Sequence, residues 1–114
     1  MYRAVEILLY KLQPDSSNIF HRVMQDISIP LHQKAGIDVV AYGKGIELED
    51  SYYLIRSYAN LAELERKQAQ FYRSEAWQTG PRNVIVSRII SSHRTVVYLE
   101  PKAIQALRRL NTGI

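Results

Sequence analysis

One stretch near the middle of the chain constrains the fold more than any other, because it has the pattern of a β-strand that runs directly into a helix. Residues 52–58 are rich in aromatic and β-branched side chains, which suit a pleated surface. Asn60 is a favoured helix-capping residue, and Glu63 follows three positions later, where it can return the hydrogen bond. Apolar or aromatic residues occupy both faces of this strand, whereas a half-solvated strand should alternate. We therefore expect both faces to be covered.

The composition is that of one globular domain. The chain has 114 residues, 46% hydrophobic and 23% charged, which is ordinary for a soluble protein with a single core. It has no cysteine, which excludes disulfides and thiolate chemistry. No run approaches the roughly 20 apolar residues of a membrane span, and the start of the chain lacks a signal-peptide pattern. We expect a cytoplasmic protein without membrane contact.

The remaining predicted elements surround the central strand in a regular order. Strands are expected at residues 5–12, 37–42 and 94–99. A first helix should follow a cap at Asp15, with Pro30 kinking its last turn or starting a new one, and further helices should begin at Leu61 and Pro101. Residues 82–91 fit a helix or a strand, and we favour a helix because the next segment is the better strand. The order predicts an α+β, ferredoxin-like fold: a four-stranded antiparallel sheet with its main helices on one face.

The second face of that sheet should be polar if it meets water. Instead, residues 5–12, 52–58 and 96–99 carry apolar or aromatic side chains on both faces. Releasing half a dozen of them from water, at roughly 1.5–3 kcal/mol each, gives on the order of 10 kcal/mol before entropic costs. We therefore expect a homodimer in which two open sheet faces stack into an α+β barrel. The alternative is a monomer whose C-terminal helix folds over the open face.

The segments, once placed, resemble the NIPSNAP family of the dimeric α+β barrel superfamily over about residues 5–100. The family's first strand, E-x-R-x-Y, corresponds to Glu6 to Tyr10, with Leu8 in place of the arginine. The other matching features are Pro14, Phe20, Pro30, Gly36, Tyr42, the Tyr58–Asn60 junction and the element from Ser74 to Trp77. Asp15 stands where the family has a glycine. The resemblance implies one NIPSNAP-like domain over residues 1–114 and a dimeric barrel, but no particular reaction.

Five residues are candidates for a ligand pocket: Tyr10, Tyr42, Arg56, Tyr58 and Trp77. The aromatic ones fall at strand ends or at the helix–sheet junction, where a ring can pack while its polar group reaches a ligand. They would line a pocket for a flat apolar molecule, or serve only in core and interface packing. Arg56 lies in an apolar strand and needs a partner or a cavity. It either pairs with Glu6 on a neighbouring strand or binds an anion.

The three histidines do not suggest a metal site. His21 and His32 fall on one predicted helix, about 16 Å apart along its axis, and we expect both to face solvent. His93, just before the last predicted strand, is a weak candidate for a haem ligand. We expect no metal and no cofactor.

Two functions remain open. The first is a homodimeric NIPSNAP-type protein that binds a small apolar ligand or a protein partner. The alternative is a cofactor-independent monooxygenase or related enzyme, in which Arg56, Tyr58 and Trp77 orient an electron-rich aromatic substrate. The net charge of +4 comes mostly from scattered residues, and the basic-aromatic strand motif of single-stranded nucleic-acid binders is missing. We therefore expect no nucleic-acid partner.

Overall fold

The computed structural model describes residues 1–111, and its centre is a four-stranded antiparallel sheet with the strand order β2-β3-β1-β4. The strands are β1 (Arg3–Leu12), β2 (Asp38–Lys44), β3 (Ser51–Tyr58) and β4 (Ile89–Leu99). Central strands β1 and β3 pair from Ala4 opposite Tyr58 to Lys11 opposite Ser51. This arrangement confirms the predicted ferredoxin-like sheet.

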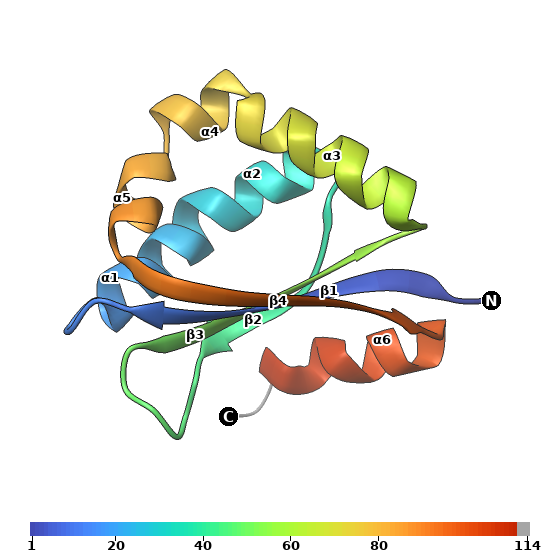
Figure 1. Ribbon diagram of the computed structural model, residues 1–114, viewed down its shortest axis with the longest axis horizontal. Coiled ribbons are helices and arrows are strands. Elements are labelled where there is room, and N and C mark those ends of the chain that lie inside the picture. Colours follow the sequence, from blue (N-terminus) through green and yellow to red (C-terminus); the bar gives the residue numbers. More distant parts are fainter. Residues whose placement is uncertain (112–114) are drawn as a thin grey trace.

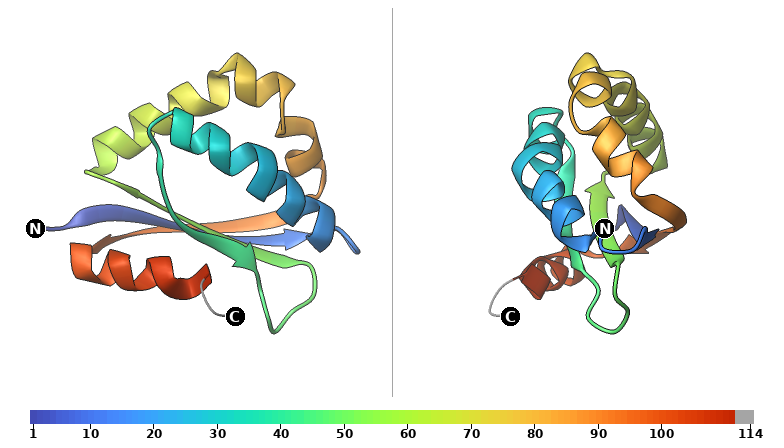
Figure 2. Two further views of the ribbon diagram at one scale, coloured as in Figure 1. Left: turned by 180° about the vertical axis from the view of Figure 1, so that it is seen from behind. Right: turned by 90° about the vertical axis from the view of Figure 1, so that its left-hand side faces the viewer.

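Two runs of helix cover one face of the sheet (Figures 1 and 2). The first run contains α1 (Ser17–Val23), the π-helix η1 (Met24–Ser28) and α2 (Ile29–Lys34). The second contains α3 (Leu61–Arg73), α4 (Glu75–Thr79) and α5 (Arg82–Ser87). The main core lies between these helices and the sheet, where Phe20, Leu64 and Phe71 pack with Leu8 and Leu54.

The segment that the sequence left ambiguous divides into two elements. Residues 82–87 form helix α5, as favoured, but β4 begins at Ile89, earlier than the predicted start at Arg94. The early part of β4 contains two serines and a histidine, which are weak strand formers by themselves. They are held as strand by pairing with β1, in which Tyr10 lies opposite Ser92.

Pro30 has the predicted effect of starting a new short helix, and the structure shows how. A proline inside a helix lacks a donor N–H and its ring crowds the carbonyl four residues earlier. The preceding turn, η1, widens to a π-helix, with the Ile29 N–H donating to the Met24 carbonyl. Pro30 then falls in the first turn of α2, where no N–H is needed.

The predicted cap of the first helix is wrong. Asp15 adopts a positive φ of 63° and precedes the helix. Its place is taken by Asp50, whose carboxylate accepts hydrogen bonds from the backbone N–H groups of Asp15, Ser16 and Ser17. The cap therefore comes from the residue just before β3, more than 30 residues away, where a local sequence pattern could not indicate it.

One helix lies on the opposite face of the sheet. α6 (Pro101–Leu107) and the 3₁₀ turn η2 (Arg108–Asn111) run beneath β2 and β3 (Figure 1). Ile104 is buried there with Val5, Val40 and Ile55, and Arg108 donates to both carboxylate oxygens of Asp38 at 2.9 and 2.8 Å. β3 is consequently covered on both faces, as its sequence predicted.

The other half of that second face remains open. Leu9 of β1 is 53% exposed and Val97 of β4 is 36% exposed, and most residues of β4 are exposed on both faces of the strand. Thus α6 provides part of the cover that the sequence demanded, and the expected homodimer stays a prediction. Among the helices of residues 1–111, none has the length and apolar character needed to cross a bilayer.

Candidate functional site

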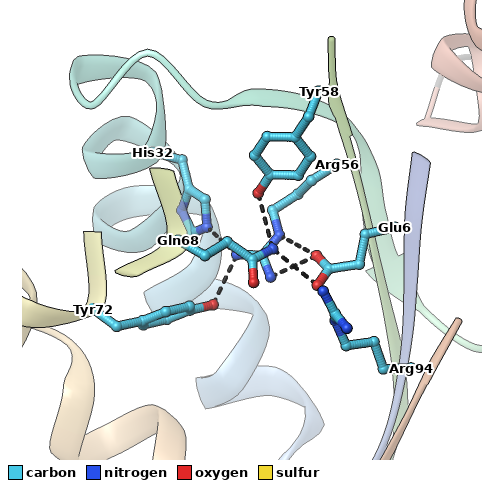
Figure 3. A network of polar contacts seen from close by, with 7 residues as sticks. All are labelled: Glu6, His32, Arg56, Tyr58, Gln68, Tyr72 and Arg94. Atoms are coloured by element: carbon cyan, nitrogen blue, oxygen red, sulfur yellow. Dashed lines mark hydrogen bonds and ion pairs between the residues drawn. The ribbon is translucent and has the colours of Figure 1, made fainter. Parts of the chain in front are cut away.

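A buried ion pair lies between the sheet and α3 (Figure 3). Glu6 of β1 and Arg56 of β3 stand directly opposite each other in the strand register, and each side chain is only 1% exposed. Arg56 Nε and Nη2 both donate to Glu6 Oε1, at 2.7 and 2.6 Å. The pairing predicted for these two residues is confirmed.

The second oxygen of the Glu6 carboxylate is also fully used. Glu6 Oε2 accepts from Gln68 Nε2 of α3 at 2.9 Å and from Arg94 Nε of β4 at 2.6 Å. Gln68 Nε2 also donates to the Tyr58 hydroxyl at 3.0 Å. Burial alone would raise the pKa of Glu6, but Arg56, Arg94 and Gln68 outweigh it, so that the pKa is lowered and Glu6 stays charged.

The far side of Arg56 contacts two groups from the helices. Its Nη1 donates to the Tyr72 hydroxyl at 2.8 Å and to His32 Nε2 at 3.0 Å. His32 Nδ1–H donates to the Ser28 carbonyl at 2.7 Å, so Nε2 is the ring's acceptor. Burial, together with the charge of Arg56, lowers the pKa of His32 to about 4. The ring is therefore neutral at physiological pH.

The expectation that both helix histidines face solvent is wrong for His32, which is 2% exposed. The π-helix adds a residue to its turn and rotates the following residues by roughly 100° relative to a regular helix. That rotation changes which side of α2 faces the sheet. His21 is partly buried, with Nδ1 at 2.6 Å from the Tyr52 hydroxyl, and His93 is exposed on β4.

The network carries one excess positive charge, and Arg94 is its most exposed member, while Gln68 and Tyr72 are half-buried. Two guanidinium groups share one carboxylate, and the histidine is neutral. Arg94 is 46% exposed, whereas its partner Glu6 is 1% exposed. Arg94 therefore forms the outer end of the network, on the strand that the helices cover least.

The five predicted pocket residues are divided between separate places. Arg56 and Tyr58 lie in the network, and Trp77 packs against Tyr72 with ring centroids 5.2 Å apart. Tyr10 packs on Phe20 and is close enough to Tyr72 and Arg56 to interact with them electrostatically, whereas Tyr42 lies beside His21. Tyr42 is thus separated from the residues around Arg56, and the joint role of the five as a pocket stays a prediction.

Sequence reasoning missed the other members of the network: His32, Gln68, Tyr72 and Arg94. A signal existed for Gln68, a polar residue on the otherwise apolar side of α3. Arg94 could not be placed without the register of β4, which sets it opposite Leu8 and diagonal to Glu6.

Two surface hollows accompany this arrangement. One, of about 440 Å³, is lined by Tyr2, Ala59, Asn60 and Tyr98, beside the end of β4. The other, of about 320 Å³, lies between α2, α3 and α4 and includes Leu31, Lys67 and Phe71. Neither is lined by any of the five predicted pocket residues. Within residues 1–111, no three histidine or carboxylate side chains are grouped so that they could hold a metal ion.

Comparison with solved structures reveals close architectural relatives. A NIPSNAP-like domain protein from Burkholderia xenovorans superposes with a TM-score of 0.78 at 17% identity, covering 87% of this chain and 86% of that one. A NIPSNAP family protein from Agrobacterium tumefaciens gives a TM-score of 0.79 at 13% identity, covering 88% of both chains. The fold is that of NIPSNAP proteins.

The same architecture occurs in a protein that has a different description. A candidate antibiotic biosynthesis monooxygenase from Nitrosomonas europaea matches with a TM-score of 0.60 at 12% identity, covering 85% of this chain and 96% of that one. No family sequence model matches the chain. No curated protein matches it in sequence either. At these identities the likeness establishes the architecture, as the resemblance in the sequence predicted.

Proposed function

We propose that the protein is a cytoplasmic, homodimeric binding protein of NIPSNAP type that holds a small, largely apolar ligand between α3 and β4. The observation that carries this proposal is the half-exposed Arg94, the most exposed member of the polar network around buried Glu6 and Arg56. Buried polar groups are normally hydrogen-bonded within the protein interior, without an extension to the surface. Here the polar network extends to β4, the strand that the helices cover least. Ligand sites are commonly found at such openings between a sheet and its helices.

The apolar side chains along this strand support the proposal. Val96 and Tyr98 lie on the same face of β4 as Arg94 and are half-buried and 61% exposed, respectively. Tyr98 also lines the 440 Å³ hollow with Tyr2. A tyrosine ring that is exposed on a rigid strand offers a flat apolar ligand a surface at little entropic cost.

An uncharged fluorescent probe tests this proposal. N-phenyl-1-naphthylamine should bind wild-type protein saturably, with one site per chain and enhanced emission. Tyr98→Ser should weaken binding about tenfold, which corresponds to ~1.4 kcal/mol. Ile46→Ser is the matched control, because Ile46 is fully exposed in the β2–β3 loop. Absence of saturable binding, or equal losses in both variants, would contradict the proposal.

The homodimer is the second part of the proposal. Leu9 and Val97 are exposed and point to the same face of neighbouring strands, because Val5 pairs with Val97 and Leu9 with His93. Together they form the open patch, defined here as Leu9 and Val97, and half-buried Ile7 lies at its border. A second copy brings an identical patch, which two-fold symmetry allows to meet itself.

The alternative function is a cofactor-independent monooxygenase. The Nitrosomonas protein with this fold supports it, as do the rings of Tyr58 and Tyr72 beside Arg56, with Trp77 packed on Tyr72. Oxygen uptake with a panel of quinols tests it: turnover that is lost in Tyr72→Phe would favour the enzyme. Silence across the panel, combined with saturable binding of the naphthylamine, would favour the binding protein.

A further inference from the structure

We infer that the ligand of this site is an apolar or aromatic carboxylate, and that Arg94 binds its anionic group. The inference rests on the proposed small-molecule site and specifies the chemistry of its ligand. It follows from the arrangement of charge around Glu6, from the atoms of Arg94 that are left over, and from the apolar surface beside them.

The first step is the charge of the cluster. Glu6 is contacted by Arg56 and Arg94, so that two cations share one anion. Gln68, Tyr58 and Tyr72 add only neutral groups, and Lys67 of α3 instead contacts Glu63 and the Gly36 carbonyl. The excess charge in a partly desolvated position is stabilised by an anion more than by a neutral ligand.

The second step is the donor geometry of Arg94. Its contact with Glu6 uses Nε, and within residues 1–111 the structure gives neither of its Nη atoms a hydrogen-bond partner. A guanidinium has five donors in a planar fork, and its two Nη groups match both oxygens of a carboxylate. Glu6 thus fixes the Arg94 side chain through Nε, while its two Nη groups are available to a ligand.

The third step is the surface next to that fork. Val96 follows Arg94 on the same face of β4, and Tyr98 follows Val96. Successive residues on one face of a strand are about 7 Å apart, so that a carboxylate at Arg94 leaves the rest of a two-ring molecule over Val96 and near Tyr98. An anionic head and a flat apolar body fit this order of side chains.

A matched pair of probes tests the inference: 2-naphthoate and its uncharged amide, 2-naphthamide, titrated by calorimetry. Wild-type protein should bind the naphthoate about tenfold more tightly than the amide, and added salt should weaken only the naphthoate. Arg94→Met should remove this preference, because it should weaken binding of the naphthoate much more than binding of the amide. Arg94→Lys, which keeps a cation beside Glu6 but not the fork, should retain part of it.

Arg66→Met is the control, because Arg66 is exposed on α3 and its loss changes the net charge equally. Equal affinities of wild-type protein for the two probes would overturn the anionic ligand while leaving apolar binding intact. A preference that survives in Arg94→Met, or that falls equally in Arg66→Met, would overturn the role of Arg94. If the protein binds none of 2-naphthoate, 2-naphthamide and N-phenyl-1-naphthylamine, the site itself would be overturned.

Discussion

At the scale of single residues, the Glu6–Arg56 pair shows what a strand sequence can reveal. A buried guanidinium in an apolar strand must be paired, since an isolated buried charge is very costly. The partner had to be an acid on an adjacent strand, and Glu6 was available. The remaining partners were not predictable, because His32, Gln68 and Tyr72 reach Arg56 or Glu6 from helices whose rotation about their axes depends on packing.

His32 makes a pH dependence of stability expected at this scale. Its pKa is 6.5 in an unfolded chain and about 4 in the fold, so that between these values the unfolded state binds more protons. Stability must therefore fall as the pH falls through this window. At ~1.4 kcal/mol per pH unit, the loss from His32 alone is about 3 kcal/mol.

Urea unfolding at intervals from pH 7 to pH 4.5 measures this loss. His32→Gln should be less stable than wild type at pH 7, because it loses contacts to Arg56 and Ser28, but it should show a much flatter pH dependence. His93→Gln, which removes a histidine that is exposed on β4, is the control for the substitution itself. Glu6 contributes in a lower range, because its lowered pKa makes it lose charge only below its usual value of 4.5. Parallel curves for His32→Gln and wild type would contradict the assignment.

At the scale of elements, the start of α3 is set by side chains within its own first turn. Asn60 accepts from the Glu63 N–H at 2.8 Å, and Glu63 accepts from the Ala59 N–H at 3.0 Å. The Asn60 cap is local, which is why the sequence predicted it, although the Glu63 carboxylate returns its bond to Ala59, one residue before the cap. Asn60→Ala should lower the free energy of unfolding by about 1 kcal/mol, as measured by urea denaturation. Asn83→Ala, an exposed asparagine inside α5, should cost nothing, because alanine is the better helix former there. Equal losses in both variants would contradict a capping role.

The elements that prediction missed depend on distant contacts. α1 is capped by Asp50, which reaches it from the position just before β3. The first residues of β4 are strand only because β1 lies alongside them. By contrast, β3 and α3 carry their own signals in composition and capping, and their bounds were predicted almost correctly. Local chemistry therefore fixes where these central elements lie, and packing fixes the ends of the outer ones.

At the scale of the whole molecule, the sheet has more apolar surface than one chain covers. α6 protects the β2–β3 half of the second face, with Ile104 against Val5 and Ile55. The sequence argument treated cover by this helix and cover by a second copy as alternatives. The structure divides the face between α6 and an uncovered remainder, the open patch of β1 and β4. A second copy is needed only for that remainder.

Light scattering at micromolar concentration measures whether a second copy provides that cover. Wild-type protein should have the mass of two 13.2 kDa chains, 26.4 kDa in total. Leu9→Arg places a charge in the patch of each protomer, so that a dimer would bury both charges. Its dissociation constant should rise at least ~100-fold, and the variant should run as a monomer. Ile46→Arg introduces the same charge in the β2–β3 loop and should remain dimeric. A wild-type protein with a mass of 13.2 kDa would instead show that α6 provides sufficient cover for the sheet. Leu9 and Val97 would then be exposed to water, as isolated apolar surface residues often are.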